Sequence, residues 1–76
     1  FQIYPNPAVA DQVNIRHSKD VTKLDLHNGR GQIVMTKQVA VGTKETTFGI
    51  DNLASGIYFF RATHSNGTSQ HKLVIP

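Results

Sequence analysis

The sequence predicts an all-β fold, a seven-stranded antiparallel immunoglobulin-like β-sandwich. Short runs rich in Val, Ile, Thr, Tyr and Phe are separated by Asn, Gly, Asp and Ser, which favour turns between strands. No segment between these runs repeats its apolar residues with the period of a helix, so we expect almost no helix. Strands at this spacing suggest an all-β sandwich or barrel, and the smaller immunoglobulin-like sandwich best suits a single domain of 76 residues.

Seven short strands are expected, each followed by residues that form turns. Their side chains alternate between two faces, so an apolar residue at every second position marks the face that packs on the opposite sheet. The expected strands are Phe1–Tyr4, Gln12–Arg16, Val21–His27, Gln32–Val39, Thr46–Ile50, Ile57–His64 and Ser69–Ile75. The side chains expected to point inward are Val13, Ile15, Leu24, Leu26, Ile33, Met35, Phe48, Ile50, Leu53, Tyr58, Phe60, Leu73 and Ile75.

The first strand is expected to end in a rigid corner. Pro5 and Pro7 each fix their own backbone φ, and Asn6 is pushed away from helical conformations because it precedes a proline. The segment from Tyr4 to Ala8 should therefore be extended and stiff.

The third and fourth strands are expected to form a hairpin around Asn28-Gly29. These two residues tolerate positive φ and suit a two-residue turn. With that turn, the residues expected to face each other are Thr22 and Met35, Leu24 and Ile33, and Leu26 and Gly31. The register brings apolar residues together on one face.

The last two strands are expected to form a second hairpin, around Asn66-Gly67. The same construction pairs Tyr58 with Ile75, Phe60 with Leu73 and Ala62 with His71. On the outer face it sets Arg61 opposite Lys72, a like-charge pair whose cost of a few tenths of a kcal/mol is too small to change the assignment.

The sixth strand is preceded by a turn that carries the chain from one sheet to the other. Leu53 supplies an apolar anchor, Gly56 permits the turn, and Tyr58 begins the strand with an aromatic side chain.

Composition excludes several functional classes. The chain has no cysteine, so disulfides and thiolate metal sites are absent. The net charge of +3 comes from basic residues spaced singly, which does not indicate a nucleic-acid site. No apolar run approaches the length of a transmembrane segment. Since the chain begins at Phe1 without a signal peptide, we expect a fragment or a processed segment of a longer protein.

The residue pattern predicts no catalytic, metal or cofactor site. The carboxylates are single, and no serine is flanked by the glycines of a nucleophile elbow. His64 and His71 are the one suggestive pair, because the second hairpin would bring them to diagonal positions. Zinc needs at least three protein ligands as a rule, so ordinary sheet-edge histidines explain the pair better.

Four motifs in order along the chain resemble the type A C-terminal sorting domain of the type IX (Por) secretion system of Bacteroidetes. The first is Tyr4-Pro5-Asn6-Pro7, and the second is an apolar-Asp-x-x-x-Gly segment that ends at Gly29. The third is Leu53-x-x-Gly56-x-Tyr58, and the last is Lys72-Leu73-Val74-Ile75. The resemblance covers nearly the whole chain, and these residues are the sorting-motif residues that it implies.

The resemblance implies a secretion signal without catalysis. Such domains form a sandwich at the end of a larger secreted protein, which reaches the periplasm by its own signal peptide. The outer-membrane translocon and its associated sorting proteins then recognise the domain and carry the cargo to the cell surface, where a sortase commonly removes the domain. A terminal β-strand at a sheet edge fits this role, since extended partners are often recognised by strand pairing.

The alternative hypothesis is that the domain is a small carbohydrate-binding or adhesion module. It would use Phe59, Arg61 and the loops, and it needs a concave polar or aromatic patch on one sheet face.

Overall fold

The computed structural model describes residues 1–6, 8 and 11–76, and this part of the chain contains seven strands and no helix. The strands are β1 (Gln2–Tyr4), β2 (Gln12–Arg16), β3 (Lys23–His27), β4 (Ile33–Gln38), β5 (Glu45–Gly49), β6 (Gly56–His64) and β7 (Gly67–Ile75). Every predicted strand is present, and its ends differ from the prediction by two residues at most. The predicted all-β fold class is confirmed.

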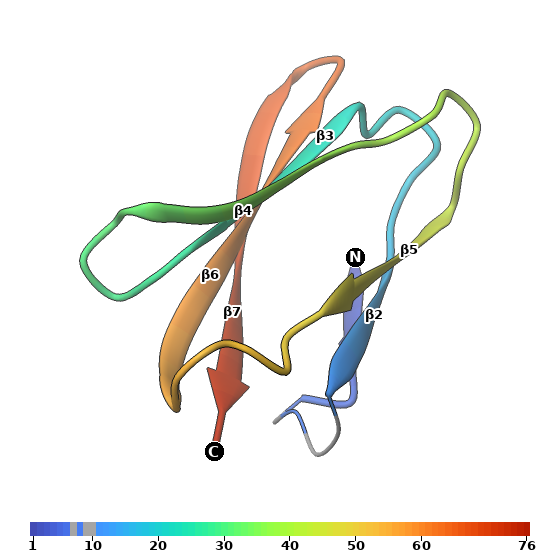
Figure 1. Ribbon diagram of the computed structural model, residues 1–76. Helices are drawn as coiled ribbons and strands as arrows, with labels where there is room; N and C mark the ends of the chain where they lie inside the picture. The colour runs from blue at the N-terminus through green and yellow to red at the C-terminus, as the bar shows by residue number, and fades with distance from the viewer. Residues whose placement is uncertain (7, 9–10) are drawn as a thin grey trace.

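The strands form two antiparallel sheets that pack face to face as a sandwich (Figure 1). Sheet A has the strand order β1-β2-β5, and sheet B has the order β4-β3-β6-β7. The last strand, β7, therefore lies at one edge of sheet B, and β4 lies at the other. Strands β6 and β7 are the longest, at nine residues each.

The core lies between the sheets. Its central contact joins Phe48 of β5 to Phe60 of β6, whose ring centroids are 5.0 Å apart with the rings edge to face. Such aromatic pairs contribute about 0.5–1.5 kcal/mol beyond the area they bury. Both side chains are inaccessible to solvent or nearly so. The core thus joins the two sheets through large apolar side chains, as expected for a domain without disulfides.

Most side chains predicted to point inward do so. The buried ones are Val13, Ile15, Leu24, Leu26, Phe48, Ile50, Tyr58, Phe60 and Leu73, and those partly buried against the core are Met35, Leu53 and Ile75. Four core members were not predicted: Ala8, Val21, Val39 and Ala62. The prediction for Ile33 was wrong, because this side chain is 58% exposed.

The first hairpin has a longer loop than the Asn28-Gly29 turn predicted. The Asn28 side-chain oxygen accepts hydrogen bonds from the backbone amides of Arg30 (2.9 Å) and Gln32 (3.0 Å). Gly31, with φ of 82°, takes the left-handed conformation that glycine favours. The side chain of Asn28 therefore organises the loop, and a tight two-residue turn does not form.

This loop changes the predicted register between β3 and β4. Leu24 faces Lys37 and Leu26 faces Met35, and an irregularity after Leu26 sets His27 opposite Ile33. The predicted pairs were therefore wrong, and the irregularity accounts for the exposed position of Ile33, since one inserted residue changes the face a side chain occupies.

The second hairpin was also predicted two positions away from its true register. The loop consists of Ser65 and Asn66, and Gly67, with φ of 134°, already pairs with His64. The observed pairs are Tyr58 with Leu73, Phe60 with His71, Ala62 with Ser69, Arg61 with Gln70 and Phe59 with Lys72. The predicted like-charge pair is therefore absent. Because the shift is an even number of residues, every side chain keeps its predicted face.

Two buried polar side chains, those of His17 and Asp25, have polar partners. The imidazole of His17 contacts the Ser18 carbonyl (2.9 Å) and the Thr46 hydroxyl (2.8 Å). The Asp25 carboxylate accepts a hydrogen bond from the Thr36 hydroxyl (2.8 Å) and lies 3.7 Å from the Lys23 ammonium. Burial of these groups is tolerated because each retains hydrogen-bonding partners.

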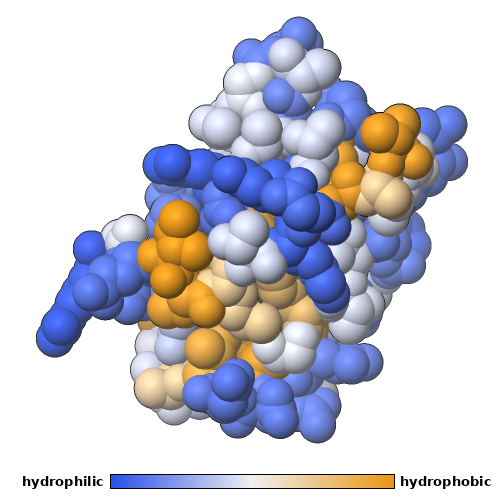
Figure 2. Space-filling view, turned by 45° about the horizontal axis from the view of Figure 1, so that its top comes forward, coloured by the Kyte–Doolittle hydropathy of each residue, from blue (hydrophilic) through white to orange (hydrophobic). Residues whose placement is uncertain are grey.

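Several large hydrophobic side chains remain on the surface. They are Phe1, Ile33, Val34, Val41 and Ile57. On the face shown in Figure 2, hydrophobic residues occupy separate areas divided by hydrophilic ones. Scattered exposed apolar residues are normal in a small domain, so only those grouped with other features need a functional explanation.

Candidate functional site

The terminal strand β7 is the element on which the predicted motifs converge. It pairs with β6 along its whole length, from His64 opposite Gly67 to Gly56 opposite Ile75. Its side chains alternate, so Leu73 is completely buried while Lys72 is exposed on the other face. The strand thus anchors itself in the core and presents the Lys72 side to solvent.

The outer edge of β7 is held by the first motif. The Asn6 side-chain amide donates to the Lys72 carbonyl (3.0 Å), and its oxygen accepts from the Val74 amide (3.2 Å). The Ala8 amide then donates to the Val74 carbonyl (2.9 Å). An asparagine side chain offers the same donor and acceptor as a peptide group. Asn6 therefore continues the hydrogen bonding of sheet B beyond its last strand.

This contact restricts how a partner could bind the strand. In an antiparallel strand, the N–H and C=O of one residue point to the same side. At Val74 both groups are already bonded, to Asn6 and to Ala8. Strand pairing by a partner at this part of the edge would require the segment around Asn6 to move away.

The first motif also connects the two sheets. Tyr4 is the last residue of β1 in sheet A, and it pairs with Asn14 of β2. The Arg16 guanidinium lies 5.9 Å from the centroid of the Tyr4 ring, within the range of a cation–π contact. Pro5 follows through a cis peptide bond, and Pro7 lies outside the described residues. The motif thus begins in sheet A and reaches the edge of sheet B at Asn6.

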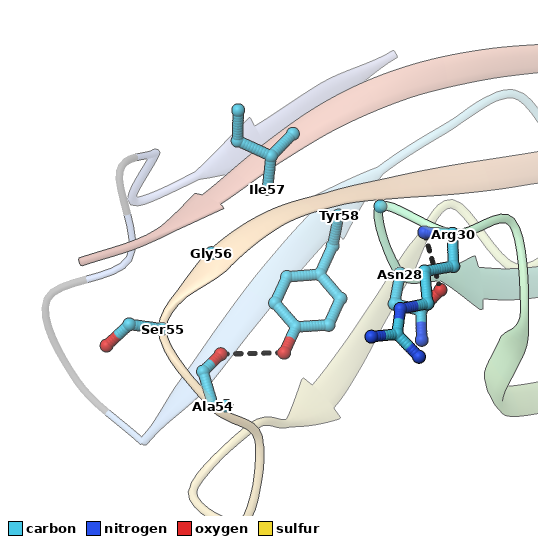
Figure 3. A pocket seen from close by; sticks show the side chains of 8 residues that line it. Asn28, Arg30, Ala54, Ser55, Gly56, Ile57 and Tyr58 are labelled. Carbon is cyan, nitrogen blue, oxygen red and sulfur yellow. Dashed lines mark hydrogen bonds between the residues drawn. The ribbon is translucent and has the colours of Figure 1, made fainter.

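The turn before β6 contacts the C-terminal end of β7, close to the residues that Asn6 holds. The Tyr58 hydroxyl donates to the Ala54 carbonyl (2.6 Å), as Figure 3 shows. The Ser55 hydroxyl donates to the Pro76 carbonyl (2.8 Å). Gly56 has φ of 152°, so its backbone conformation requires glycine, whereas a Cβ would meet only the Tyr58 ring at an ordinary 4.0 Å. Leu53 packs partly buried against the core.

Gly29 lies next to this turn. A Cβ on it would be 3.7 Å from the Ile57 carbonyl oxygen, an ordinary contact. Gly29, Asn28 and Arg30 line a shallow surface depression together with residues 54–58 (Figure 3). Residues from two motifs that are far apart in the sequence are therefore neighbours at one end of sheet B.

A second shallow depression lies on the outer face of sheet B. It is lined by His27, Asn28, Gly31, Phe59, Arg61 and Gln70. The Nδ1 atom of His27 is 3.2 Å from the Gly31 carbonyl, and its buried Nε2 has no hydrogen-bonding partner in the described part of the chain. The alternative reading of the sequence placed a binding patch at Phe59 and Arg61, and the structure brings these two residues together here.

His64 and His71, the pair singled out from the sequence, meet through a serine. The Ser69 hydroxyl is 2.7 Å from Nε2 of His64 and 3.0 Å from Nε2 of His71. Desolvation lowers the pKa of the His71 imidazole. Among the residues that the structure describes, no three His, Cys, Asp or Glu side chains gather to hold a metal ion.

The same network includes the carboxylate of Asp20, which the sequence did not predict to lie near these histidines. Nδ1 of His64 is 3.5 Å from Asp20, whose other oxygen accepts a hydrogen bond from the Ser65 hydroxyl (2.9 Å). Hydrogen bonds from the hydroxyls of Ser18 and Ser65 hold the pKa of the Asp20 carboxyl well below its usual range. No local sequence pattern could have revealed this contact, because it joins the turn before β3 to the β6–β7 loop.

The row Asp20, His64 and Ser69 has the order of a hydrolase triad, yet its surroundings fit a structural role. Ser69 lies within a strand, and its hydroxyl is shared with a second imidazole, that of His71. Neither surface depression described above is lined by any of these residues. A nucleophile needs room for a substrate beside it, so the row is better explained as a network that fastens the β6–β7 hairpin.

Comparison with known protein families identifies the family of the chain. Residues 2–76 match the family model of the secretion system C-terminal sorting domain. No curated protein and no solved structure was found to match the chain. Within the described residues, no helix has the length and apolar character needed to cross a membrane. The family match extends over essentially the whole chain, and the protein therefore belongs to the C-terminal sorting domains of type IX secretion, a family of export signals.

Proposed function

We propose that this domain is recognised by the type IX translocon as a folded unit whose recognised element is β7, held in place by the other motifs. The observation that carries the proposal is the pair of hydrogen bonds from Asn6 to Lys72 and Val74. These bonds join the first motif of the sequence to the last. Residues of the ordered motifs and their neighbours thus surround the terminal strand β7. We call the set formed by Asn6, Ala8, Ser55 and Tyr58 the frame.

The contacts of the frame hold the C-terminal half of β7 at its outer edge, beyond its last residue and from the core side. Asn6 and Ala8 hold its outer edge, and Ser55 contacts the Pro76 carbonyl beyond its end. Tyr58, buried opposite Leu73, supports it from the core side. A terminal strand fixed in this way presents Lys72 and Val74 in a constant orientation, which reduces the conformational entropy lost on binding a partner.

In this proposal the domain acts without catalysis, as sorting domains do in general. The cargo protein supplies any enzymatic activity. The cargo crosses the periplasm, and the translocon with its associated sorting proteins carries it to the cell surface or into the medium. A surface sortase removes the domain upstream of β1, which leaves the sandwich intact because β1 pairs with β2 from Gln2 onward.

A carbohydrate-binding or adhesion module is the second candidate. The observation in its favour is the depression that brings Phe59 and Arg61 together with His27 and Gln70. Aromatic faces with adjacent polar groups suit sugars. The depression is shallow, however, and the family match points to export.

The test is an export assay in a bacterium that has the type IX system. Residues 1–76 are fused to the C-terminus of a reporter directed to the periplasm, and reporter is measured in the medium, on the cell surface and in the periplasm. We expect the fusion to leave the cell and a deletion of residues 72–76 to accumulate in the periplasm. Export of the deletion at the level of the intact fusion would contradict the proposal and favour the binding module.

The deletion also removes core packing, so a milder variant is needed beside it. Asn6→Ala removes the two side-chain bonds to β7 while leaving Leu73 buried. If the frame matters for recognition, Asn6→Ala should lower export in cells grown well below its melting temperature. Asn66→Ala, an exposed substitution in the β6–β7 loop, is the matched control and should be exported normally.

A further inference from the structure

The positive charge of the protein is concentrated on sheet B. Its strands and the β3–β4 loop contain five of the eight basic residues, namely Lys23, Arg30, Lys37, Arg61 and Lys72, against a single carboxylate, Asp25. The rest of the chain contains three basic residues and four carboxylates. Sheet B with its β3–β4 loop therefore carries a net charge of +4, and the rest of the chain carries −1.

Asp25, the carboxylate of sheet B, lies directly opposite Arg61 in the register of β3 and β6, without forming an ion pair with it. Asp25 is 5% exposed, and its oxygens are engaged by Thr36 and Lys23. Within the described part of the chain, the ion pairs are Lys23 with Asp25 and His64 with Asp20. Arg61 and Lys72 are thus exposed cations with no carboxylate partner among the described residues.

Apolar side chains lie beside these cations on the same face. Alternation along β6 and β7 turns Ile57, Phe59 and Val74 outward, away from the core. Ile57 faces Val74 across the two strands and is 48% exposed, and Phe59 faces Lys72. Figure 3 shows Ile57 on the opposite side of β6 from the Tyr58 ring. The outer face therefore combines an apolar stripe with a flanking row of positive charge.

The edge of β7 is a poorer binding site than this face. Backbone groups of Lys72 and Val74 are already bonded to Asn6 and Ala8, so a partner strand would first have to displace that segment. On the outer face, the side chains of Ile57, Arg61 and Lys72 are exposed and those of Phe59 and Val74 are partly exposed without any such rearrangement. Recognition through side chains requires less change in the folded domain than recognition by strand addition.

We propose that the outer face of β6 and β7, formed by Ile57, Phe59, Arg61, Lys72 and Val74, docks on an acidic protein surface that carries apolar side chains at its centre. The inference rests on the proposed function and identifies the chemistry of the partner. Unpaired cations select a surface of opposite charge and accelerate the encounter with it, while the apolar stripe supplies contact area. A basic or uncharged partner would leave Arg61 and Lys72 without a counter-charge.

The first experiment compares two double charge reversals with the same change in net charge. Arg61→Glu with Lys72→Glu alters the docking face, whereas Lys19→Glu with Lys44→Glu alters exposed cations outside sheet B. Since the first pair replaces attraction by repulsion at the partner surface, we expect the exported fraction of the reporter to fall about tenfold or more. The control pair should be exported as efficiently as the unaltered fusion. Melting curves of both purified variants are measured beside export.

The outcome separates this inference from the proposed function. If the unaltered fusion is not exported, the proposed function itself fails. If the fusion is exported and the two double variants are exported equally, the sorting function stands and the docking face is wrong. If the two double variants have the same melting temperature, a loss of export in one of them is not caused by unfolding.

A second measurement tests the chemistry of the partner. A photo-crosslinking amino acid replaces Phe59 on the docking face and, in a control, Thr47, which is exposed on β5 of sheet A. We expect an adduct at position 59, formed during export, whose attached peptide has a negative net charge. An attached peptide without acidic residues, an attached saccharide, or equal crosslinking from position 47 would overturn the proposal.

Discussion

Sheet A is built from strands of three to five residues, whereas β6 and β7 of sheet B run for nine residues each. Both sheets contribute fully buried side chains to the same core, such as Ile15 of β2 and Phe60 of β6. Most of the motif residues, and the cations Arg61 and Lys72 of the docking face, lie in contrast on β6 and β7 or near the ends of these strands. The comparison indicates that sheet A serves to close the core, while sheet B closes the core and also carries the proposed docking face on β6 and β7.

The first motif contacts both sheets. Tyr4 belongs to sheet A, and two residues later Asn6 already bonds to the outer strand of sheet B. The segment from Tyr4 to Asn6 therefore connects sheet A to β7 of sheet B. Its side-chain bonds act over 66 and 68 residues of sequence, so they can form only when the sandwich is complete.

The largest expected effect comes from the core that both sheets share. Phe60→Ala removes the side chain that contacts Phe48 across the two sheets, and we expect a loss of about 3–5 kcal/mol in the free energy of unfolding. Phe59→Ala, one residue away but on the outer face, should have a much smaller effect on stability. Thermal denaturation followed by circular dichroism measures both. Equal melting temperatures for the two variants would show that the assignment of faces along β6 is wrong.

The next effect concerns the link between the sheets. Asn6→Ala removes two hydrogen bonds to β7, and since each is worth about 0.5–1.5 kcal/mol when partly exposed, the melting temperature should fall by several degrees. Hydrogen exchange gives a local readout. The amide of Val74, which donates to Asn6, should exchange faster in the variant, while the amide of Ile50, which donates to Asp11, should not change. An unchanged Val74 amide would mean that the bond does not form in solution.

A smaller effect distinguishes two glycines at one end of sheet B. Gly56→Ala places a side chain at φ of 152° and should destabilise the domain by about 1 kcal/mol. Gly29→Ala meets only an ordinary contact, 3.7 Å from the Ile57 carbonyl, so its stability should stay within about 0.5 kcal/mol of the unaltered protein. Urea denaturation of the two variants measures the difference. The reverse order of stabilities would contradict the assigned backbone conformations.

The smallest expected effect on stability is a pH-dependent one at Asp20, in the turn that leads from β2 of sheet A to β3 of sheet B. The pKa of Asp20 is depressed in the folded protein, so this carboxylate stabilises the fold fully above its unfolded pKa of about 4, and its contribution declines as the pH falls from that value toward the lower pKa of the folded state. Asp20→Asn should therefore lower the melting temperature at pH 7 and lower it by less near pH 2. A difference between the two proteins that stays constant from pH 7 to pH 2 would show that the carboxylate charge is not involved.

The fold class and the strands were predictable because they depend on local alternation. Each inward side chain of β6 and β7 kept its face although the predicted register was wrong by two residues, since strand periodicity is also two. In the first hairpin the inserted residue next to His27 changed this parity, and the prediction failed at Ile33. An Asn-Gly pair marks a turn but does not determine how many residues the loop contains.

The contacts around the site could not be predicted from the sequence. The bond from Asn6 to Val74 and that from Ser65 to Asp20 join residues far apart in the chain, and no local pattern specifies such a partner. The polar groups of Asp25 and His17 are satisfied by neighbouring strands in the same way. The motif residues themselves were recognisable, but their arrangement around β7 became visible only in the folded chain.

The central claim is that sheet B presents the recognised surface and sheet A does not. The most direct test compares export of the reporter fused to two single variants, Lys72→Glu on β7 and Lys44→Glu before β5, both of them exposed. Both should melt close to the unaltered domain, because an exposed substitution usually changes stability by about 0.5 kcal/mol or less. The account predicts that Lys72→Glu leaves the reporter in the periplasm while Lys44→Glu is exported normally. Equal export of the two variants would contradict it.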